Sequence, residues 1–371
     1  MNKKISTRIL LLIFLFVMFA PTVSYFFAKD YLPSQNGENR NLAEKPTLSF
    51  RGIADYPKKF DDYYGDNMPY RSELVRLWRD LNYSIFNESV DDRVLLGKNE
   101  NDEPWLFYDN VNDGDELSYI NGKKVFTEEE LSVASEKMRE QTAKCLSKNI
   151  DLFYIMLPNK STVYSEYLPK STITKEDAFI PMFNYLKEHG IDNIYYPSEL
   201  LQRAKSNGEL YYRTDTHWNQ LGAYVVADRV MQCIYGKELF GEIKITNAYT
   251  EDFSGDLHSF MGISESMKDN CITVDYGNTS KITKDSIKVG DGKLFIYHNP
   301  EYKIDETALL VGDSFSINAV LPFTSVYKKV VHVPLNTTVY STDMLKRFKP
   351  TKVFVVGVER YSMLRLTQTI A

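Results

Sequence analysis

The sequence is poor in cysteine and in positive charge. Its 371 residues include only three cysteines, at positions 145, 233 and 271. Because these are widely spaced and odd in number, they favour neither a disulfide framework nor a zinc site. Lysine and arginine number 44 against 50 acidic residues, which gives a formal net charge of −6. The chain therefore lacks the block of positive charge that nucleic-acid binding requires, and we expect no nucleic-acid partner.

Repeats and low-complexity segments are also missing. Hydrophobic residues make up 43% of the chain, and the length fits one large or two ordinary domains. This composition is enough for a sizeable core, so it argues against a disordered or fibrous protein.

The first 28 residues have the features of an export segment. Lys3, Lys4 and Arg8 precede an uncharged, largely apolar run over residues 9–28. A helix of about 20 residues is long enough to cross roughly 30 Å of hydrocarbon. No clear cleavage site follows, so we predict an uncleaved N-terminal transmembrane helix in the cell membrane, with secretion after cleavage as the alternative. Because the positive flank stays in the cytoplasm, the rest of the chain is expected on the extracellular side.

Three kinds of pattern follow this segment. Residues 29–50 are polar and have no hydrophobic period, which is typical of a tether. In residues 56–86, apolar side chains recur at steps of three and four, which predicts an amphipathic helix. Residues 94–108 contain two short apolar runs around a turn, which predicts a β-hairpin. The predicted domains are residues 1–28, 29–115 and 116–371.

Strand and helix patterns alternate in the last of these domains. Thr127 and Glu130 form a capping box that starts a helix ending near residue 147. Strands are predicted at 151–158, 193–196, 307–315, 330–333 and 352–358, and helices at 178–190, 217–236 and 342–348. This order predicts an α/β fold with a mostly parallel sheet and helices on both faces. Residues 240–300 interrupt the order with short β-prone pieces, and we interpret them as a β-rich insertion.

One predicted strand ends in a serine turn. The sequence TALLVGDSF at 307–315 leads through Gly312 and Asp313 to Ser314. Open parallel sheets place functional loops at the carboxyl ends of their strands. A serine there exposes its hydroxyl, and its own N–H can help to hold an oxyanion, so Ser314 is a candidate nucleophile for acyl transfer. The alternative is a simple turn and helix cap.

Asp215 and His217 are separated by one residue, just before a strong helical pattern. Of the five histidines, His217 is the one with a nearby aspartate at a strand-to-helix junction. A serine nucleophile needs a base, and that base needs a carboxylate to fix its tautomer, so we predict a triad of Ser314, His217 and Asp215. The alternative is a capping aspartate and a satisfied histidine. A metal site would need a third ligand, and the spacing shows none, so we expect no metal.

Together these motifs resemble a known family. Gly-Asp-Ser-Phe at 312–315 resembles the nucleophile block of SGNH hydrolases. Asp-Thr-His-Trp-Asn at 215–219, with Gly-Ala at 222–223, resembles the base block of the alginate O-acetyltransferase (AlgJ/AlgX-like, DHHW) branch. In ordinary SGNH enzymes the serine block comes first; here the order is reversed, as in that branch. The resemblance implies an SGNH-hydrolase-like, flavodoxin-like fold with a circularly permuted motif order.

The resemblance also implies a function. The triad would transfer acetyl groups, through an acyl-enzyme, to hydroxyls of an exported or cell-envelope polysaccharide, without a cofactor. The implied donor partner is a polytopic membrane acyltransferase of the MBOAT type, because the cell exterior has no supply of acetyl-CoA. With water as acceptor, the same residues would form a carbohydrate acetylesterase. A noncatalytic polysaccharide-binding assembly subunit is a third possibility.

Six further residues are candidates for contact with the substrate or the oxyanion: Gly312, Lys160, Tyr164, Trp218, Asn219 and Arg360. Lys160 and Tyr164 follow the end of a predicted strand, where functional loops lie. Their structural alternatives are a solvated lysine and a packed tyrosine. Trp218 could equally belong to the core, and Arg360 could form a structural ion pair with Glu359.

Overall fold

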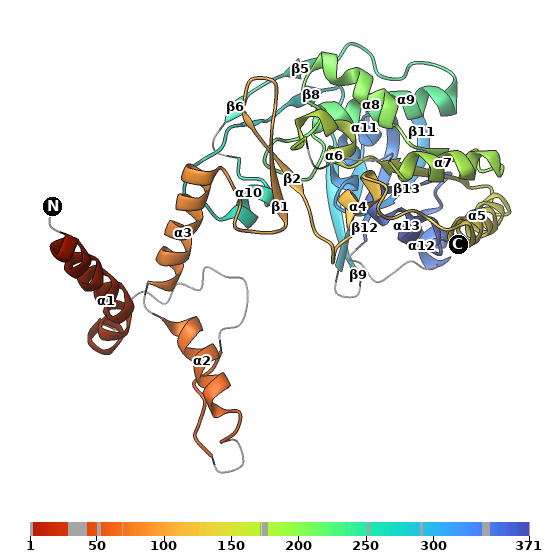
Figure 1. Cartoon of the computed structure of the whole chain (residues 1–371). Coiled ribbons are helices and arrows are strands. Elements are labelled where there is room, and N and C mark those ends of the chain that lie inside the picture. Colours follow the sequence, from red (N-terminus) through yellow and green to blue (C-terminus); the bar gives the residue numbers. More distant parts are fainter. Residues whose placement is uncertain are drawn as a thin grey trace. The chain divides into compact units, whose positions relative to one another are not determined.

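The computed structural model describes residues 3–28, 43–49, 53–68, 70–170, 172, 177–250, 253–289, 292–335 and 342–370. Two compact units form the chain (Figure 1). The smaller unit comprises Met1–Asn87 and Gly262–Glu265, and the larger comprises Glu88–Met261 and Ser266–Ala371. The hairpin at 94–108, which we grouped by sequence with residues 29–115, belongs to the larger unit.

The smaller unit is helical. Its helices are α1 (Lys3–Ala28), α2 (Tyr56–Asn67) and α3 (Arg71–Phe86). The helical pattern at 56–86 is therefore two helices. The break begins at Met68, which is extended because the residue before a proline disfavours the α conformation.

The prediction of a transmembrane helix in residues 1–28 is not supported. Residues 9–28 are helical as part of α1, but within the described ranges no helix is both long and apolar enough to cross a membrane. Most of the predicted tether, residues 29–50, lies outside the described residues.

A seven-stranded mixed sheet forms the centre of the larger unit, in the order β4–β3–β13–β11–β12–β10–β9. Its strands are β3 (Asp151–Leu157), β4 (Ile194–Tyr195), β9 (Thr283–Val289), β10 (Gly292–His298), β11 (Ile304–Gly312), β12 (Tyr327–Pro334) and β13 (Lys352–Val358). The strands from β4 to β12 in this order run parallel, as predicted, whereas β10 pairs antiparallel with both β12 and β9. The two antiparallel strands come from the region predicted as a β-rich insertion.

Both faces of the sheet are covered, because alternate strand residues point in opposite directions. On β13, Phe354 and Val356 pack in one buried cluster, and Val353 and Val355 pack in the other. The first cluster includes α8 (Ser198–Ala204), α9 (Gln220–Tyr235) and α11 (Ser316–Val326). The second includes α5 (Glu128–Leu146), α7 (Phe179–Glu188), α12 (Thr342–Phe348) and α13 (Ser362–Leu366). The prediction of a sheet between two helical layers is confirmed (Figure 1).

Shorter elements complete the unit. The hairpin of β1 (Val94–Lys98) and β2 (Pro104–Tyr108) and the capping box of Thr127 and Glu130 form as predicted. The insertion contains β5 (Lys244–Thr246), β6 (Tyr249–Thr250), β7 (Asp269–Asn270), β8 (Thr273–Asp275) and the helix α10 (Asp256–Met261). The remaining helices are α4 (Glu116–Ile120) and α6 (Lys160–Val163), with 3-10 turns at Ser165–Tyr167, Lys205–Asn207 and Glu359–Tyr361.

The register of the parallel strands collects functional loops at one edge. Gly312 at the end of β11 pairs with Val356, and Val358 at the end of β13 pairs with Leu157 at the end of β3. The turns after these three strands therefore lie side by side at the carboxyl edge of the sheet, where open α/β sheets hold their ligands.

Candidate active site

The turn after β11 presents Ser314 to solvent. A Cβ at Gly312 would lie 2.3 Å from the carbonyl oxygen of Val356 and 2.5 Å from Cβ of Ser316. Only glycine therefore fits where the strand ends. The Asp313 carboxylate then fixes the turn, because it accepts hydrogen bonds from the N–H groups of Phe315 and Val358, both at 3.0 Å. Ser314 itself is exposed, and within the described part of the chain its N–H has no hydrogen-bond acceptor.

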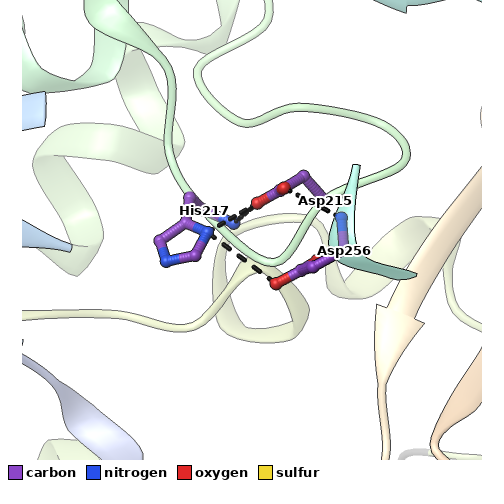
Figure 2. A group of neighbouring side chains, drawn as sticks. All are labelled: Asp215, His217 and Asp256. Carbon is purple, nitrogen blue, oxygen red and sulfur yellow. Dashed lines mark hydrogen bonds and ion pairs between the residues drawn. The ribbon is translucent and has the colours of Figure 1, made fainter. Parts of the chain in front are cut away.

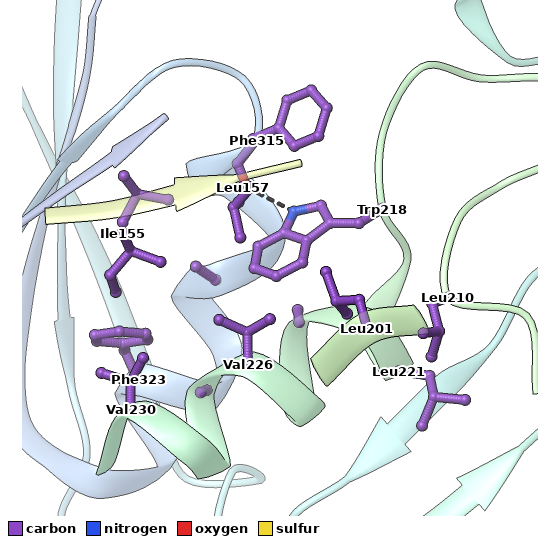
Figure 3. Close-up of a cluster of buried hydrophobic side chains, with 14 of the residues drawn as sticks. Ile155, Leu157, Leu201, Leu210, Trp218, Leu221, Val226, Val230, Phe315 and Phe323 are labelled. Atoms are coloured by element: carbon purple, nitrogen blue, oxygen red, sulfur yellow. Dashed lines mark hydrogen bonds between the residues drawn. The ribbon is translucent and has the colours of Figure 1, made fainter. Parts of the chain in front are cut away.

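The segment before α9 is attached directly to this turn. The Trp218 indole is only 1% exposed, and its N–H donates to the carbonyl oxygen of Phe315 at 2.8 Å (Figure 3). Asn219 is fully buried and caps α9, since its Oδ1 accepts from the N–H groups of Leu221 and Gly222. These two predicted substrate contacts therefore hold the protein's own backbone. Of the two interpretations of Trp218, substrate contact and core, the structure fits the core, because the residue has almost no exposed surface.

This attachment brings Ser314, His217 and Asp215 together. Nε2 of His217 lies 2.7 Å from Oγ of Ser314, across a separation of 97 residues in the chain. Nδ1 of the same ring lies 2.6 Å from Oδ1 of Asp215, which also accepts the His217 backbone N–H at 2.8 Å. The imidazole is thus placed between a hydroxyl and a carboxylate, the arrangement needed to take a proton from the hydroxyl.

The Asp215 carboxylate is ionised at neutral pH. Burial raises the pKa of Asp215, but the hydrogen bond and the charge of His217 outweigh burial, so the pKa falls to about 2. The Phe315 ring packs beside the imidazole, with the ring centroids 4.8 Å apart. The position of the imidazole is therefore fixed both by a charged hydrogen bond and by packing.

Replacing Asp215 with asparagine should change how stability depends on pH. A folded-state pKa of about 2 lies below the usual value of 3.8, so the carboxylate stabilises the fold above pH 3.8, and this contribution is lost as pH falls. From pH 5 to pH 3 the wild type is expected to lose about 1 kcal/mol more free energy of unfolding than Asp215→Asn. Urea unfolding at the two pH values measures the difference. An equal loss in both proteins would contradict the ionised, paired carboxylate.

Lys160 binds the backbone of the loop before His217. Its ammonium donates to the carbonyl oxygens of Tyr212, Arg213 and Asp215, at 3.0, 3.2 and 2.7 Å. Burial lowers the pKa of Lys160 to about 8, although the surrounding carboxylates act in the opposite direction. Lys160 is 3% exposed, so it is neither a solvated lysine nor a free substrate contact.

Tyr164 and Arg360 are structural as well. Tyr164 is 2% exposed, and its hydroxyl accepts the N–H of Leu210. Arg360 donates to Glu116 at 3.1 Å and to Asn159 at 2.8 Å. The predicted ion pair between Glu359 and Arg360 is therefore wrong. Glu359 is instead fully buried and accepts hydrogen bonds from Asn159, Thr162 and Tyr196.

Sequence reasoning missed Asp256 at the start of α10. One of its carboxylate oxygens lies 3.9 Å from Nδ1 of His217, and Figure 2 shows Asp215 and Asp256 facing the same nitrogen. Asp256 lies 41 residues after Asp215, within the predicted insertion, so spacing gave no signal for it.

Asp256 corrects one argument against a metal site, namely that the chain offers no third ligand. One potential ligand atom from each of Asp215, His217 and Asp256 lies within 4.8 Å of the others, so a third group does exist. Each of these groups already has a partner, however: Asp215 accepts from His217, and Asp256 accepts from Thr216. A cation at Nδ1 would displace the hydrogen bond that orients the imidazole toward Ser314. The observed contacts therefore fit a proton relay better than a metal centre.

Known proteins are similar to this chain in sequence and in fold. A protein from Pseudomonas putida named probable alginate O-acetylase AlgJ is 24% identical over 268 residues, covering 70% of this chain and 64% of that protein. A protein of the same name from Pseudomonas syringae pv. tomato is 29% identical over 214 residues, covering 56% of this chain and 50% of that protein. The chain thus spans between half and two thirds of the length of these relatives.

The structure of PatB1 from Bacillus cereus has a similar fold, with a TM-score of 0.55 and 15% identity over 74% of this chain and 99% of PatB1. A family model described as the SGNH hydrolase-like domain of acetyltransferase AlgX matches residues 95–335. That range is more than half of the chain and contains Asp215, His217 and Ser314, and the chain therefore belongs to this SGNH hydrolase-like family.

Proposed function

We propose that this protein is an O-acetyltransferase that places acetyl groups on hydroxyls of an exported or cell-envelope polysaccharide. The observation that carries the proposal is the hydrogen-bonded series from Ser314 through His217 to Asp215, with distances of 2.7 and 2.6 Å. Membership of an acetyltransferase family supports the acetyl group, and the names of the two AlgJ relatives support a polysaccharide as acceptor.

Each residue has a defined part in the proposed cycle. Oγ of Ser314 attacks the acetyl carbonyl while Nε2 of His217 takes the hydroxyl proton. The oxyanion is held in part by the free N–H of Ser314, and the ionised Asp215 stabilises the imidazolium. When the oxyanion collapses, the donor group leaves with the proton from His217, and the acetyl group stays on Ser314. A sugar hydroxyl then gives its proton to His217 and attacks the acetyl ester, and Oγ of Ser314 leaves with that proton from His217 as its hydroxyl is restored.

Exposure of the site favours an acetylesterase as the second candidate. Ser314 is exposed and the His217 side chain is 23% exposed, so water reaches both ends of their hydrogen bond. Transfer rather than hydrolysis requires that a bound acceptor exclude water from the acetyl-enzyme. The two activities use the same first step and differ only in the acceptor.

The proposal includes a location and a donor. Lys3, Lys4 and Arg8 before the uncharged run at 9–28 are typical of an export segment, and they support work on the extracellular side of the cell membrane. Since acetyl-CoA is not available there, the donor is proposed to be a polytopic membrane acyltransferase of the MBOAT type.

Cleavage of a chromogenic acetyl ester tests the catalytic part. Wild-type protein is expected to release acetate, and Ser314→Ala is expected to lose this activity. Ser147→Ala is the matched control, because Ser147 is also exposed but contacts only the end of its own helix. Equal rates for wild type and Ser314→Ala would leave only a binding role.

Added oligosaccharides then separate the two enzymatic candidates. The transferase predicts that an acceptor gains the mass of an acetyl group in a reaction that depends on Ser314. Acetate without a mass gain on any tested sugar would favour the esterase.

A further inference from the structure

We infer that Asp256 is a second carboxylate of the relay: it positions the Asp215–His217 segment and adds negative charge beside the imidazole. The inference rests on the proposed function, because it assigns a role in the same proton transfer. It does not depend on whether the acetyl acceptor is a sugar or water.

Three hydrogen bonds join Asp256 to this segment. Its two oxygens accept the backbone N–H of Thr216 at 2.8 Å and the Thr216 hydroxyl at 2.6 Å. Its own N–H donates to Oδ2 of Asp215 at 3.0 Å, while Oδ1 of Asp215 accepts from His217. Asp256 thus fixes Thr216, which lies between Asp215 and His217, and it also binds Oδ2 of Asp215, the oxygen that does not contact His217. A shift of α10 would move the imidazole relative to Ser314.

The negative charge of Asp256 also lies close to the imidazole ring of His217. Its Oδ2 lies 3.9 Å from Nδ1 of His217, and its side chain is 33% exposed. The negative charge at this distance stabilises the positive charge that forms on the ring when it takes the proton from Ser314.

Few other charges face the ring from the elements around it. Asp215 contacts Nδ1 directly. Lys160, from α6, acts through the carbonyl oxygen of Asp215. Arg360 lies 5.5 Å from the centre of the Phe315 ring, which packs on the imidazole. Asp256 is therefore a second carboxylate within 4 Å of Nδ1, and its removal should be visible in a pH profile.

Asp269 provides a matched comparison on the same loop. It accepts the N–H of Thr214 at 2.7 Å, the Thr214 hydroxyl at 2.6 Å and the N–H of Arg213 at 2.8 Å. Its hydrogen bonds are of the same kind as those of Asp256, but they reach only as far as Thr214, the residue before Asp215. A purely structural role predicts similar behaviour for the two carboxylates.

The pH dependence of kcat/KM for acetyl-ester cleavage tests the inference. Asp256→Asn is expected to lower kcat/KM about tenfold near pH 7 and to move the acidic limb of the profile down by roughly half a pH unit to one unit. Asp256→Glu keeps the charge and should restore the wild-type limb. Thr216→Val removes the hydroxyl that donates to Asp256 and lies 3.3 Å from Nδ1 of His217, but it removes no charge. It should therefore lower kcat/KM and leave the limb in place, and Asp269→Asn should also leave it in place.

Two outcomes would overturn the inference. The first is an acidic limb in Asp256→Asn that coincides with the wild-type limb. The second, which applies even if Asp256→Asn does not fold, is an unchanged kcat/KM in Thr216→Val. If the wild type shows no cleavage that depends on Ser314, the proposed function fails and this inference fails with it. Cleavage that depends on Ser314 but not on Asp256 would overturn the inference alone.

Discussion

Replacing His217 with glutamine is expected to lower the rate of acetyl-ester cleavage by a factor on the order of 10³ or more. Glutamine occupies a similar space and keeps a polar end, but it cannot accept a proton from Ser314 at neutral pH. The imidazole is the base nearest to this hydroxyl, at 2.7 Å, and it is fixed by Asp215 and by Phe315. The loss should therefore appear in kcat, with a smaller change in KM.

A double variant makes this prediction sharper. Residues that act as one unit give losses that do not add. His217→Gln combined with Ser314→Ala should therefore be no slower than Ser314→Ala alone. Initial rates for wild type, both single variants and the double variant provide the comparison. Losses that multiply would show that Ser314 and His217 act independently, against the shared relay.

Replacing Gly312 with alanine is expected to cause a large loss of stability for the addition of a single methyl group. The added Cβ would lie 2.3 Å from the Val356 carbonyl oxygen, on the neighbouring strand, and 2.5 Å from Ser316. Backbone atoms cannot move aside as a flexible side chain can, so β11 must separate from β13 or the turn must open. Overpacking of this kind costs about 1–3 kcal/mol, and we expect the upper end.

The displaced turn carries Ser314, so activity should fall as well, even where the variant stays folded. Gly241→Ala is the matched control, because a Cβ added at Gly241 would meet no atom of the described residues within 4 Å, and the φ angle of Gly241 is not positive. Urea unfolding of both variants, with cleavage rates measured below the transition, tests the prediction. Equal stabilities for the two variants would mean that the close approach of β11 and β13 is not needed.

Much of the fold could be predicted from the sequence because its patterns are local. The strand at 151–158 and the helix at 178–190 are uninterrupted apolar or amphipathic runs, and each ends at a proline or a glycine. The pairing of β10 with β12, which adds the β9–β10 hairpin to the sheet, could not be predicted, because it depends on contacts between segments that are separate in the chain.

The residues of the candidate site also differ in whether a local sequence pattern could identify them. Asp215, His217 and Ser314 could be chosen because proton transfer restricts the residue types and because two of them share one short motif. The roles of Lys160 and Asn219 could not be told from sequence, since a polar side chain near a motif can bind either substrate or backbone. Both bind backbone carbonyl or N–H groups here. Asp256 could not be recognised from the sequence, because it is 41 residues away from Asp215 and approaches the motif only in the folded chain.

Covalent labelling with phenylmethylsulfonyl fluoride tests the central claim most directly. An activated hydroxyl displaces fluoride from this reagent, and the sulfonyl group remains on the serine oxygen. The account predicts a single adduct on Ser314 of the wild type, located by peptide mass spectrometry, and no adduct on that residue in His217→Gln. Equal labelling of Ser314 in both proteins, or labelling only at other residues, would contradict a Ser314 nucleophile activated by His217.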